Sequence, residues 1–495
     1  MSQQNRIATI VNSKFYPLLL FFASFVFVTL FSRSTSFLYV FEGADPSVFK
    51  QMGLALLKGK TLYIDYFDNK GCLLYFIHAF GLWLGGNFFL LLMQSLSLTI
   101  TLLIWNKMLA LYRNQRQQII CLGIALFLLL CFYGAGDQTQ EWCLPFISYP
   151  LLVYFRAYKT KSEIRPFQMF LVGLCFGIIT FIQVNNACAF LGFIAYLWIQ
   201  YLLKKDFRKF FSSLACFVSG WIIVPAICVL YFYLKAGWPG VHEMVYASFL
   251  SNLEYIGNQW KPRLTSTIPY YLFLLAFLSI QIINSYKEKG IIVPFIISIC
   301  LFIGTFGKQC NQFYLIAIIP LCIISMMTVS FSEKRKANYW LCGIVLICLA
   351  FYSCNPMSHL VNDLVLQKEQ ELTIYEDFHH CIETIPENER DSIYNYNLYW
   401  HGTSMMEHEG LLQCNKVLYT PLVYTLPKLH KDKDSNPIVA PKWILLSLNN
   451  FYEKQHVSFI LKNYELSCSF HYDKRFFKKL HFGDEFDVYL YRRKD

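Results

Sequence analysis

The chain has 495 residues, of which 56% are hydrophobic, 18% aromatic and only 15% charged, and its mean hydropathy is +0.38. Because soluble domains carry about 25% charged residues, this composition excludes an ordinary soluble protein and indicates a membrane protein. The net charge of +11 does not indicate nucleic-acid binding, because the basic residues lie in short clusters between apolar runs, as they do in cytoplasmic loops.

Apolar runs long enough to cross a bilayer, about 20 residues each, recur along most of the chain. We predict about eleven spans, in chain order at residues 15–33, 87–110, 118–133, 143–158, 166–184, 187–203, 210–233, 266–284, 290–306, 312–331 and 338–354. If the N-terminus is cytoplasmic, the basic clusters all fall in cytoplasmic loops, at residues 113–116, 159–165, 204–209, 287–289 and 334–336. This agreement supports both the number of spans and their orientation.

One apolar segment, Gly71–Gly85, has only fifteen residues. Counting it as a span would reverse every later loop and place the basic clusters outside. We therefore expect a helix that lies in, or dips into, the outer membrane interface. It would close a first external loop of residues 34–86.

The chain divides into two regions. Residues 1–354 are predicted to form the membrane domain. Residues 355–495 are polar and contain short alternating runs such as SIYNYNLYW, WILLSLNNFY and FDVYLYRR, which predict a small α/β domain. An odd number of spans places this domain outside, which in a bacterium is the periplasm. Its cysteines Cys381, Cys414 and Cys468 allow at most one disulfide, and the pattern does not say which pair forms it.

The first external loop carries acidic residues among aromatic ones, followed by a lysine; the charged residues of interest are Glu42, Asp45, Asp65, Asp68 and Lys70. Asp45 precedes Pro46 and opens a helical stretch whose residues Val48, Met52, Ala55 and Leu56 share one face. An aspartate before proline is a good helix N-cap, so Asp45 is either a structural cap or a functional carboxylate.

The stretch DPSVFKQMGLALLKGKTLYIDYFDNKGCLLY resembles the early acidic motif and the "G..Y.D..D.KGPL" segment of GT-C glycosyltransferases. It is most similar to the bacterial protein O-mannosyltransferase and lipid A aminoarabinose transferase types, which take sugars from polyprenyl-phosphate carriers. The resemblance implies an α-helical polytopic membrane protein in a GT-C arrangement, with periplasmic juxtamembrane helices.

On this resemblance Asp45 is the catalytic carboxylate and Lys70 contacts the carrier phosphate, while Asp65 and Asp68 bind substrate. The chain departs from the motif at two positions. Pro46 replaces a second acid, which weakens a metal site, and Cys72 replaces the expected proline.

A second segment, GAGDQTQEWCLPF at Gly134–Phe146, resembles the "GGN.TEE..LPF" stretch of the same enzymes. It implies a catalytic role for Glu141 and substrate binding by Asp137. The alternative is a short polar turn that caps a helix. An ionisable group at membrane depth is costly, which favours function.

Two further clusters resemble the family. Asn185 and Asn186 match a polar segment at the outer end of a span and imply sugar binding. In GKQCNQFY, Lys308 replaces an arginine as a phosphate contact, and Gln312 and Tyr314 bind substrate. A lysine that anchors at the membrane interface is an equal alternative for Lys308.

The resemblance implies an inverting glycosyltransferase that moves a sugar from a polyprenyl-phosphate carrier to an acceptor hydroxyl of a lipid, glycan or protein. It would act at the outer face of a bacterial inner membrane. No cofactor is assigned, and a divalent cation is left open.

Three alternatives remain at this point. A lipid-linked sugar flippase or transporter would need charged groups at the membrane midplane. An outer-leaflet polysaccharide polymerase would concentrate its chemistry in a later external loop. A structural protein with a C-terminal glycan-binding module is the third.

Overall fold

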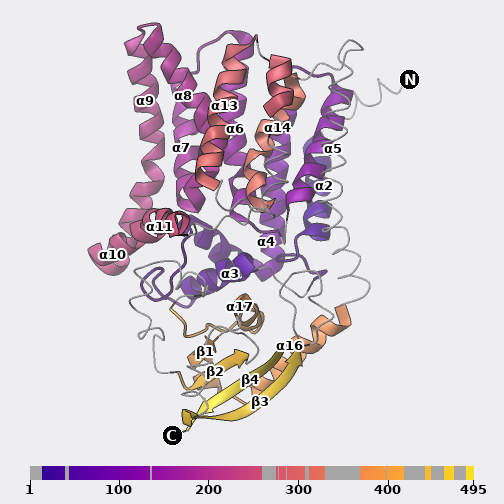
Figure 1. Cartoon of the computed structure of the whole chain (residues 1–495), viewed down its shortest axis with the longest axis vertical. Coiled ribbons are helices and arrows are strands. Elements are labelled where there is room, and N and C mark those ends of the chain that lie inside the picture. The colour runs from indigo at the N-terminus through magenta and orange to yellow at the C-terminus, as the bar shows by residue number, and fades with distance from the viewer. Residues whose placement is uncertain are drawn as a thin grey trace.

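The structure is a computed structural model of the chain. It describes residues 14–39, 44–133, 136–258, 275–276, 278–285, 287–306, 312–328, 368–396, 399–416, 418, 441–447, 462–472 and 486–494. A helical bundle forms one end of the molecule and a small sheet forms the other, with the short helix α3 (Ala44–Leu57) between them (Figure 1).

The described part of the bundle is built from apolar helices. They are α2 (Tyr16–Phe31), α4 (Cys72–Leu109), α5 (Gln115–Phe132), α6 (Thr139–Thr160), α7 (Pro166–Gln183), α8 (Cys188–Leu203), α9 (Phe207–Trp221), α10 (Ile223–Val245), α13 (Lys289–Phe306) and α14 (Ile319–Thr328). The 3₁₀ turn η1 (Val184–Ala187) joins α7 to α8, and the 3₁₀ segment η3 (Gln312–Ile318) precedes α14. A π turn, η2 (Tyr246–Leu250), joins α10 to α11 (Ser251–Asn258).

Within the described residues, four helical runs are long and apolar enough to cross a membrane: Cys72–Leu109, Gln115–Phe132, Pro166–Leu203 and Phe207–Glu254. Shorter apolar helices cover Tyr16–Phe31, Lys289–Thr305 and Phe313–Thr328. Helices therefore occupy most of the predicted spans, but a count of eleven is not established. The predicted span 338–354 and most of the span 266–284 lie outside the described residues.

The basic loops that the structure describes, at residues 113–116, 159–165, 204–209 and 287–289, lie together at the end of the bundle that points away from the sheet (Figure 1). Lys209 forms an ion pair with Glu163, at 2.9 Å, which joins the first turn of α9 to the α6–α7 loop. The Lys159 ammonium lies 4.4 Å from the centre of the Tyr112 ring. Such a concentration of cations at one end is the pattern of a cytoplasmic face.

Helix α4 is broken as the sequence predicted. Gly85 and Gly86 have non-helical backbone angles, and Gly86 has a φ of 63°. They separate a first segment, Cys72–Leu84, from the longer apolar helix that continues to Leu109. The end of the Gly71–Gly85 helix is therefore confirmed.

The C-terminal unit (residues 368–494 where described) contains a four-stranded sheet in the order β1-β2-β4-β3. Its strands are β1 (Ile393–Tyr396), β2 (Trp443–Ser447), β3 (Tyr464–Tyr472) and β4 (Phe486–Arg493). β1 pairs with β2 in parallel, and β4 runs antiparallel to β2 and β3. Strands β1, β2 and β4 coincide with three of the alternating runs, so the small α/β fold is confirmed.

Two helices, α16 (Lys368–Glu383) and α17 (Tyr399–His408), accompany this sheet. The side chains of Phe378, Ile382 and Trp443 lie in its apolar core. Cys381 on α16 forms a disulfide with Cys468 on β3, whereas Cys414 is a free buried thiol. The predicted single disulfide is confirmed and its pairing identified.

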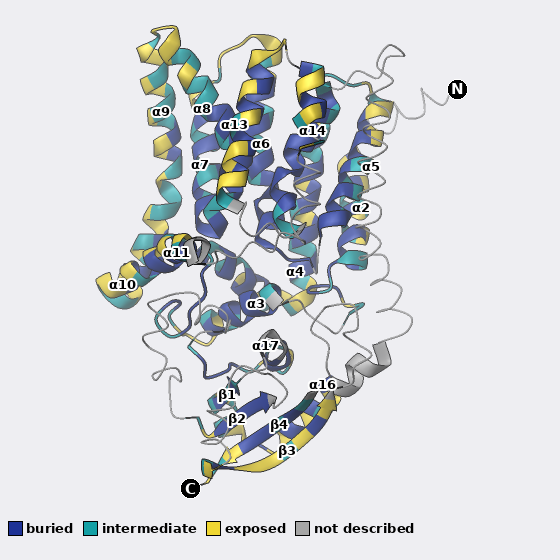
Figure 2. Ribbon diagram, viewed as in Figure 1, coloured by how far each residue is buried: buried dark blue, intermediate teal, exposed yellow. Residues whose placement is uncertain are grey.

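The C-terminal unit packs directly on the first external loop. Helix α17 lies against α3. The Phe67 N–H donates to the Lys416 carbonyl at 2.6 Å, and Gln51 Nε2 donates to the Leu411 carbonyl at 2.7 Å. Burial of the loop between bundle and sheet is visible in Figure 2.

We expect removal of the disulfide to destabilise the C-terminal unit. In Cys381→Ser, the cross-link between residues 87 positions apart is lost, which lowers the free energy of unfolding by about 2–5 kcal/mol. Limited proteolysis of the purified chain should then show faster cleavage within residues 368–494. A Cys414→Ser variant, which leaves the disulfide intact, is the control; equal cleavage of Cys381→Ser and wild type would contradict the prediction.

Candidate functional site

Helix α3 begins at the first candidate residue. Ala44 and Asp45 open the helix, and Val48, Met52 and Ala55 are buried on one face, as their spacing predicted. This face packs against the first segment of α4. Asp45 is therefore held at the N-terminal end of a helix that is fixed along its length.

Asp68, Lys70 and Tyr75 form a hydrogen-bonded group where the loop enters α4. The Tyr75 hydroxyl donates to Asp68 Oδ2 at 2.6 Å and accepts from the Lys70 N–H at 3.3 Å. The Lys70 ammonium donates to Asn69 Oδ1 at 2.8 Å. Just beyond, the Gly71 N–H donates to the Ile182 carbonyl at 3.0 Å. A Cβ at Gly71 would lie 2.1 Å from the Phe181 carbonyl oxygen, so only glycine permits this close approach.

Asp45 lies close enough to this group to interact with it electrostatically. Burial raises the pKa of Asp45 above its usual value; the positive charge of Lys70 opposes that shift and the negative charge of Asp68 adds to it. We call Asp45, Asp68, Lys70 and Tyr75 the first-loop site. It brings an acid of raised pKa and a cation into one environment.

Asp65 does not belong to the first-loop site by its contacts. Its carboxylate accepts the Thr61 N–H at 2.7 Å, and its own N–H donates to the Thr61 carbonyl at 2.9 Å. These bonds close the turn that precedes the site. Its contacts are those of a residue that shapes the loop.

Asp137 is the centre of a second, fully buried group. His78 Nε2 lies 3.1 and 3.0 Å from its two oxygens, Trp142 Nε1 donates at 2.9 Å, and Ser34 Oγ donates at 3.2 Å. Lys50, whose ammonium donates to the Ser34 carbonyl at 2.6 Å, adds a positive charge nearby. We call these five residues the Asp137 cluster.

Burial tends to raise the pKa of Asp137. The opposing effects of His78 and Lys50 are together larger, so the pKa of Asp137 lies below its usual value. Asp137 itself has a φ of 59° and follows Gly136, at 77°. This left-handed turn directs the carboxylate into the bundle.

The imidazole of His78 contacts an acceptor at each ring nitrogen. Nδ1 lies 2.8 Å from the Leu74 carbonyl oxygen, which can only accept a hydrogen bond. Nε2 faces the Asp137 carboxylate, which when ionised can also only accept. Both ring nitrogens therefore face oxygen atoms that can accept a hydrogen bond, and the imidazole is held between the Leu74 carbonyl and the Asp137 carboxylate.

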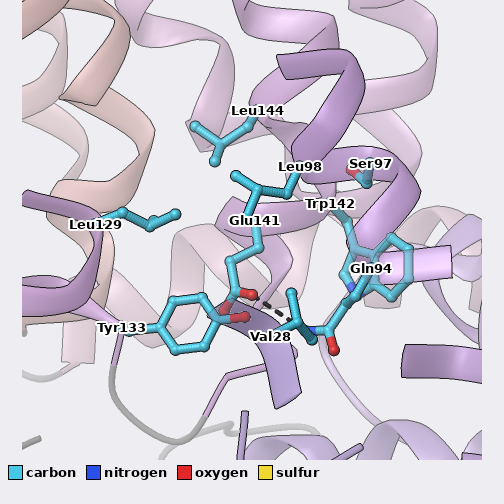
Figure 3. Close-up of a pocket in the computed structure, with 9 residues that line it drawn as sticks. All are labelled: Val28, Gln94, Ser97, Leu98, Leu129, Tyr133, Glu141, Trp142 and Leu144. Atoms are coloured by element: carbon cyan, nitrogen blue, oxygen red, sulfur yellow. Dashed lines mark hydrogen bonds between the residues drawn. The ribbon is translucent and has the colours of Figure 1, made fainter. Parts of the chain in front are cut away.

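Glu141 lies in the first turn of α6 and points toward α4 and the end of α5 (Figure 3). Oε1 accepts the Gln138 N–H at 3.1 Å, and Oε2 accepts from Gln94 Nε2 at 3.1 Å. The first of these bonds belongs to a capping box. Glu141 therefore caps helix α6, as the alternative interpretation of this segment expects, and it also makes a polar contact with Gln94 on α4.

A small cavity lies beside Glu141, and Tyr133, Ser97 and Leu98 are among the residues that line it (Figure 3). It has room for about one water molecule. A sugar does not fit in it.

Buried amides occupy the junction of α6 and α7. Thr139 donates to Gln183 Oε1, which also accepts from Gln140 Nε2 at 3.3 Å. Asn186 in η1 contacts the Cys143 sulfur at 3.4 Å and is fully buried, whereas its neighbour Asn185 is half-buried. The structure thus brings Asn186 close to α6 but not into the first-loop site.

The last candidate segment is only partly described. Lys308 lies outside the described residues, and Gln312 begins η3. Tyr314 is half-buried, with its ring 4.5 Å from that of Phe313. Glu42 also lies outside the described residues.

Lys50 and His78 were not predicted from the sequence. Lys50 stands in the amphipathic α3 and His78 in the apolar Gly71–Gly85 segment, yet neither side chain is exposed. A charged residue inside each of these segments was the available signal, because such groups are rarely buried without a partner. Among the described residues, no three His, Cys, Asp or Glu side chains are grouped so as to hold a metal ion.

Comparison with known proteins identifies a family. The family described as putative competence-induced protein Ccs4, N-terminal domain, matches residues 3–339, and the chain belongs to it. No curated protein matches the chain. Among solved structures, the archaeal oligosaccharyltransferase AglB from Archaeoglobus fulgidus, in complex with an inhibitory peptide and a dolichol-phosphate, is similar. The match covers 96% of this chain and 74% of that one, at 11% identity and a TM-score of 0.49. A superposition of this quality is too loose to show a shared fold.

We expect Asp137→Asn to destabilise the bundle. The substitution removes the buried carboxylate that His78, Trp142 and Ser34 contact and that the Lys50 charge stabilises, and breaking a buried pair of this kind costs about 3–5 kcal/mol. The melting temperature of the purified protein in detergent should fall clearly. Glu163→Gln, at an exposed ion pair, should leave it nearly unchanged, and equal melting of the two variants would refute the central role of Asp137.

Proposed function

We propose that this member of the Ccs4 family is an inverting glycosyltransferase that uses a polyprenyl-phosphate sugar donor. Its chemistry takes place in the first-loop site. Two kinds of support are combined: the resemblance of residues 45–75 to GT-C enzymes, and the contacts that surround those residues.

One observation carries the proposal: Asp45, the carboxylate at the start of α3, lies within electrostatic range of Lys70 and Asp68. Transfer from a lipid phosphate needs a base for the acceptor and a cation for the departing phosphate. Both kinds of group are present, and each is held by packing or hydrogen bonds. The raised pKa of Asp45 suits a general base better than the pKa of an exposed aspartate does.

The reaction would proceed as a single displacement. The acceptor oxygen forms a bond to the anomeric carbon while the bond from that carbon to the phosphate oxygen breaks. Asp45 takes the proton of the acceptor hydroxyl. Lys70 stabilises the negative charge that grows on the departing polyprenyl phosphate. Attack opposite the leaving group inverts the anomeric configuration.

The remaining candidates would act around this centre. Asp68 and Tyr75 would hold Lys70 in place through their hydrogen bonds. Lys308 would be a second phosphate contact, and Asn185, Asn186, Gln312 and Tyr314 would bind the sugar. Glu141 would support the site indirectly, since its carboxylate is already engaged by Gln94 and Gln138.

We propose that the first-loop site faces the outside of a bacterial inner membrane. The basic loops at the opposite end support this orientation, because such loops stay in the cytoplasm. The disulfide of the C-terminal unit, which packs on the first loop, supports it independently, since disulfides persist in oxidising compartments.

Asp45→Asn should abolish transfer while leaving the fold intact. Loss of a general base lowers kcat by about 10²–10⁴-fold. The measurement is transfer of radiolabelled sugar from a panel of undecaprenyl-phosphate sugars to membrane extract. The matched control is Asp391→Asn, an exposed aspartate that pairs with Lys58, the residue that follows α3. Full activity of Asp45→Asn would refute its role as base.

The acid limb of the pH–rate profile should report the charge of Lys70. Activity requires ionised Asp45, so it falls as the pH drops through the raised pKa of that group. Lys70 lowers the pKa of Asp45, so Lys70→Gln removes a stabilising charge and raises the pKa further. The acid limb then moves to higher pH, whereas Lys58→Gln should not move it. An unshifted limb in Lys70→Gln, measured on its residual activity, would show that the two groups do not interact.

A further inference from the structure

Two buried cysteines meet directly behind the first-loop site. Cys72 is the first residue of α4, two positions after Lys70, and Cys228 lies in α10. Their sulfur atoms are 3.5 Å apart, and the residues are 0% and 3% exposed. Since 156 positions separate them in the chain, only the packing of α10 against the start of α4 brings them together.

The loop that leads to this pair contacts the unit that carries the Cys381–Cys468 disulfide. Phe67, five positions before Cys72, is hydrogen-bonded to Lys416 of the C-terminal unit. That unit contains the Cys381–Cys468 disulfide. A structural disulfide persists in an oxidising environment, which is the environment that oxidation of the Cys72–Cys228 pair would require.

We propose that Cys72 and Cys228 are a modification site: a thiol pair that oxidises to a disulfide and cross-links α4 to α10. The inference does not depend on the enzymatic activity. The sulfur–sulfur distance must shorten from 3.5 Å to about 2.05 Å.

A peroxide is a sufficient oxidant. One cysteine, as its thiolate, attacks the peroxide oxygen and becomes a sulfenic acid, with release of water once a proton is taken up. The second thiol then attacks that sulfur, a sulfur–sulfur bond forms, and a second water leaves. In total, two thiols and one hydrogen peroxide give one disulfide and two waters.

The cross-link would act on the loop that holds Lys70. After Cys228, the chain turns at Gly237, where φ is 64°, and returns as the end of α10, η2 and α11. On this returning segment Asn252 Nδ2 donates to the Asn69 carbonyl at 2.7 Å, and the Phe67 and Tyr246 rings lie 6.1 Å apart. A covalent bond at Cys72 therefore ties the first loop to α10, whose continuation through η2 and α11 already contacts that loop.

The test uses the full-length protein in detergent, divided into a sample treated with hydrogen peroxide and a sample kept in reductant. Both are then denatured in N-ethylmaleimide, digested and analysed by mass spectrometry. We expect peroxide to abolish labelling of Cys72 and Cys228 and to produce one joined peptide pair that lacks two hydrogens. The reduced sample should be labelled at both positions.

Single variants separate this pairing from other oxidation. Cys228→Ala should leave Cys72 without its partner, so that no joined peptide forms. The control is Cys188→Ala, which removes a buried free thiol on α8 and should still give the Cys72–Cys228 peptide. Full labelling of both cysteines after peroxide, or a joined peptide between either of them and a different cysteine, would overturn the proposal. Because Cys188→Ala and wild type both retain the pair, a folding defect in Cys228→Ala alone does not decide the result.

Discussion

The Asp137 carboxylate is the group on which the arrangement of the site depends. A buried anion is tolerated only when donors and opposite charges surround it. Its donors come from the segment after α2, from α4 and from α6, and the nearby cation comes from α3. Four parts of the chain are thereby held at one point, and α3 cannot rotate without withdrawing Lys50 from the bundle. Since Asp45 lies on that same helix, the position of the proposed base follows from a charge balance elsewhere.

The first loop is held from two further directions. The segment after α10 contacts it through Asn252, and the C-terminal unit contacts it through Lys416. The segment after α10 and the C-terminal unit thus both contact the stretch from Tyr63 to Gly71, where the backbone is neither helix nor regular strand. Such a stretch is stable only because its hydrogen bonds are satisfied by neighbours that are rigid in their own right.

Sequence patterns predicted what depends on local spacing. The buried face of α3, the helix break at Gly85–Gly86 and three of the four strands, β1, β2 and β4, follow from periodicity or from glycine, which are properties of neighbouring residues. Partners that lie far apart in the chain were not predictable in this way. The amphipathic pattern that contains Lys50 does not indicate that this lysine lies near Ser34 and Asp137. The residues around His78 likewise do not predict its contact with Asp137, which lies 59 positions later in the chain. The resemblance to the GT-C motif assigns Asp65 and Asp68 the same role, yet a turn of the loop gives them different contacts.

The hydrogen bond between the Tyr66 hydroxyl and the Gln413 carbonyl joins residues 347 positions apart. It sets an order of events during biosynthesis. The ribosome synthesises the first loop long before the C-terminal unit. The loop therefore lacks this hydrogen bond while the later helices are being inserted. The bundle can assemble early, but the region around Lys70 acquires its last hydrogen bonds only when nearly the whole chain has been synthesised. The surroundings of the first-loop site are therefore completed in one of the last steps of folding.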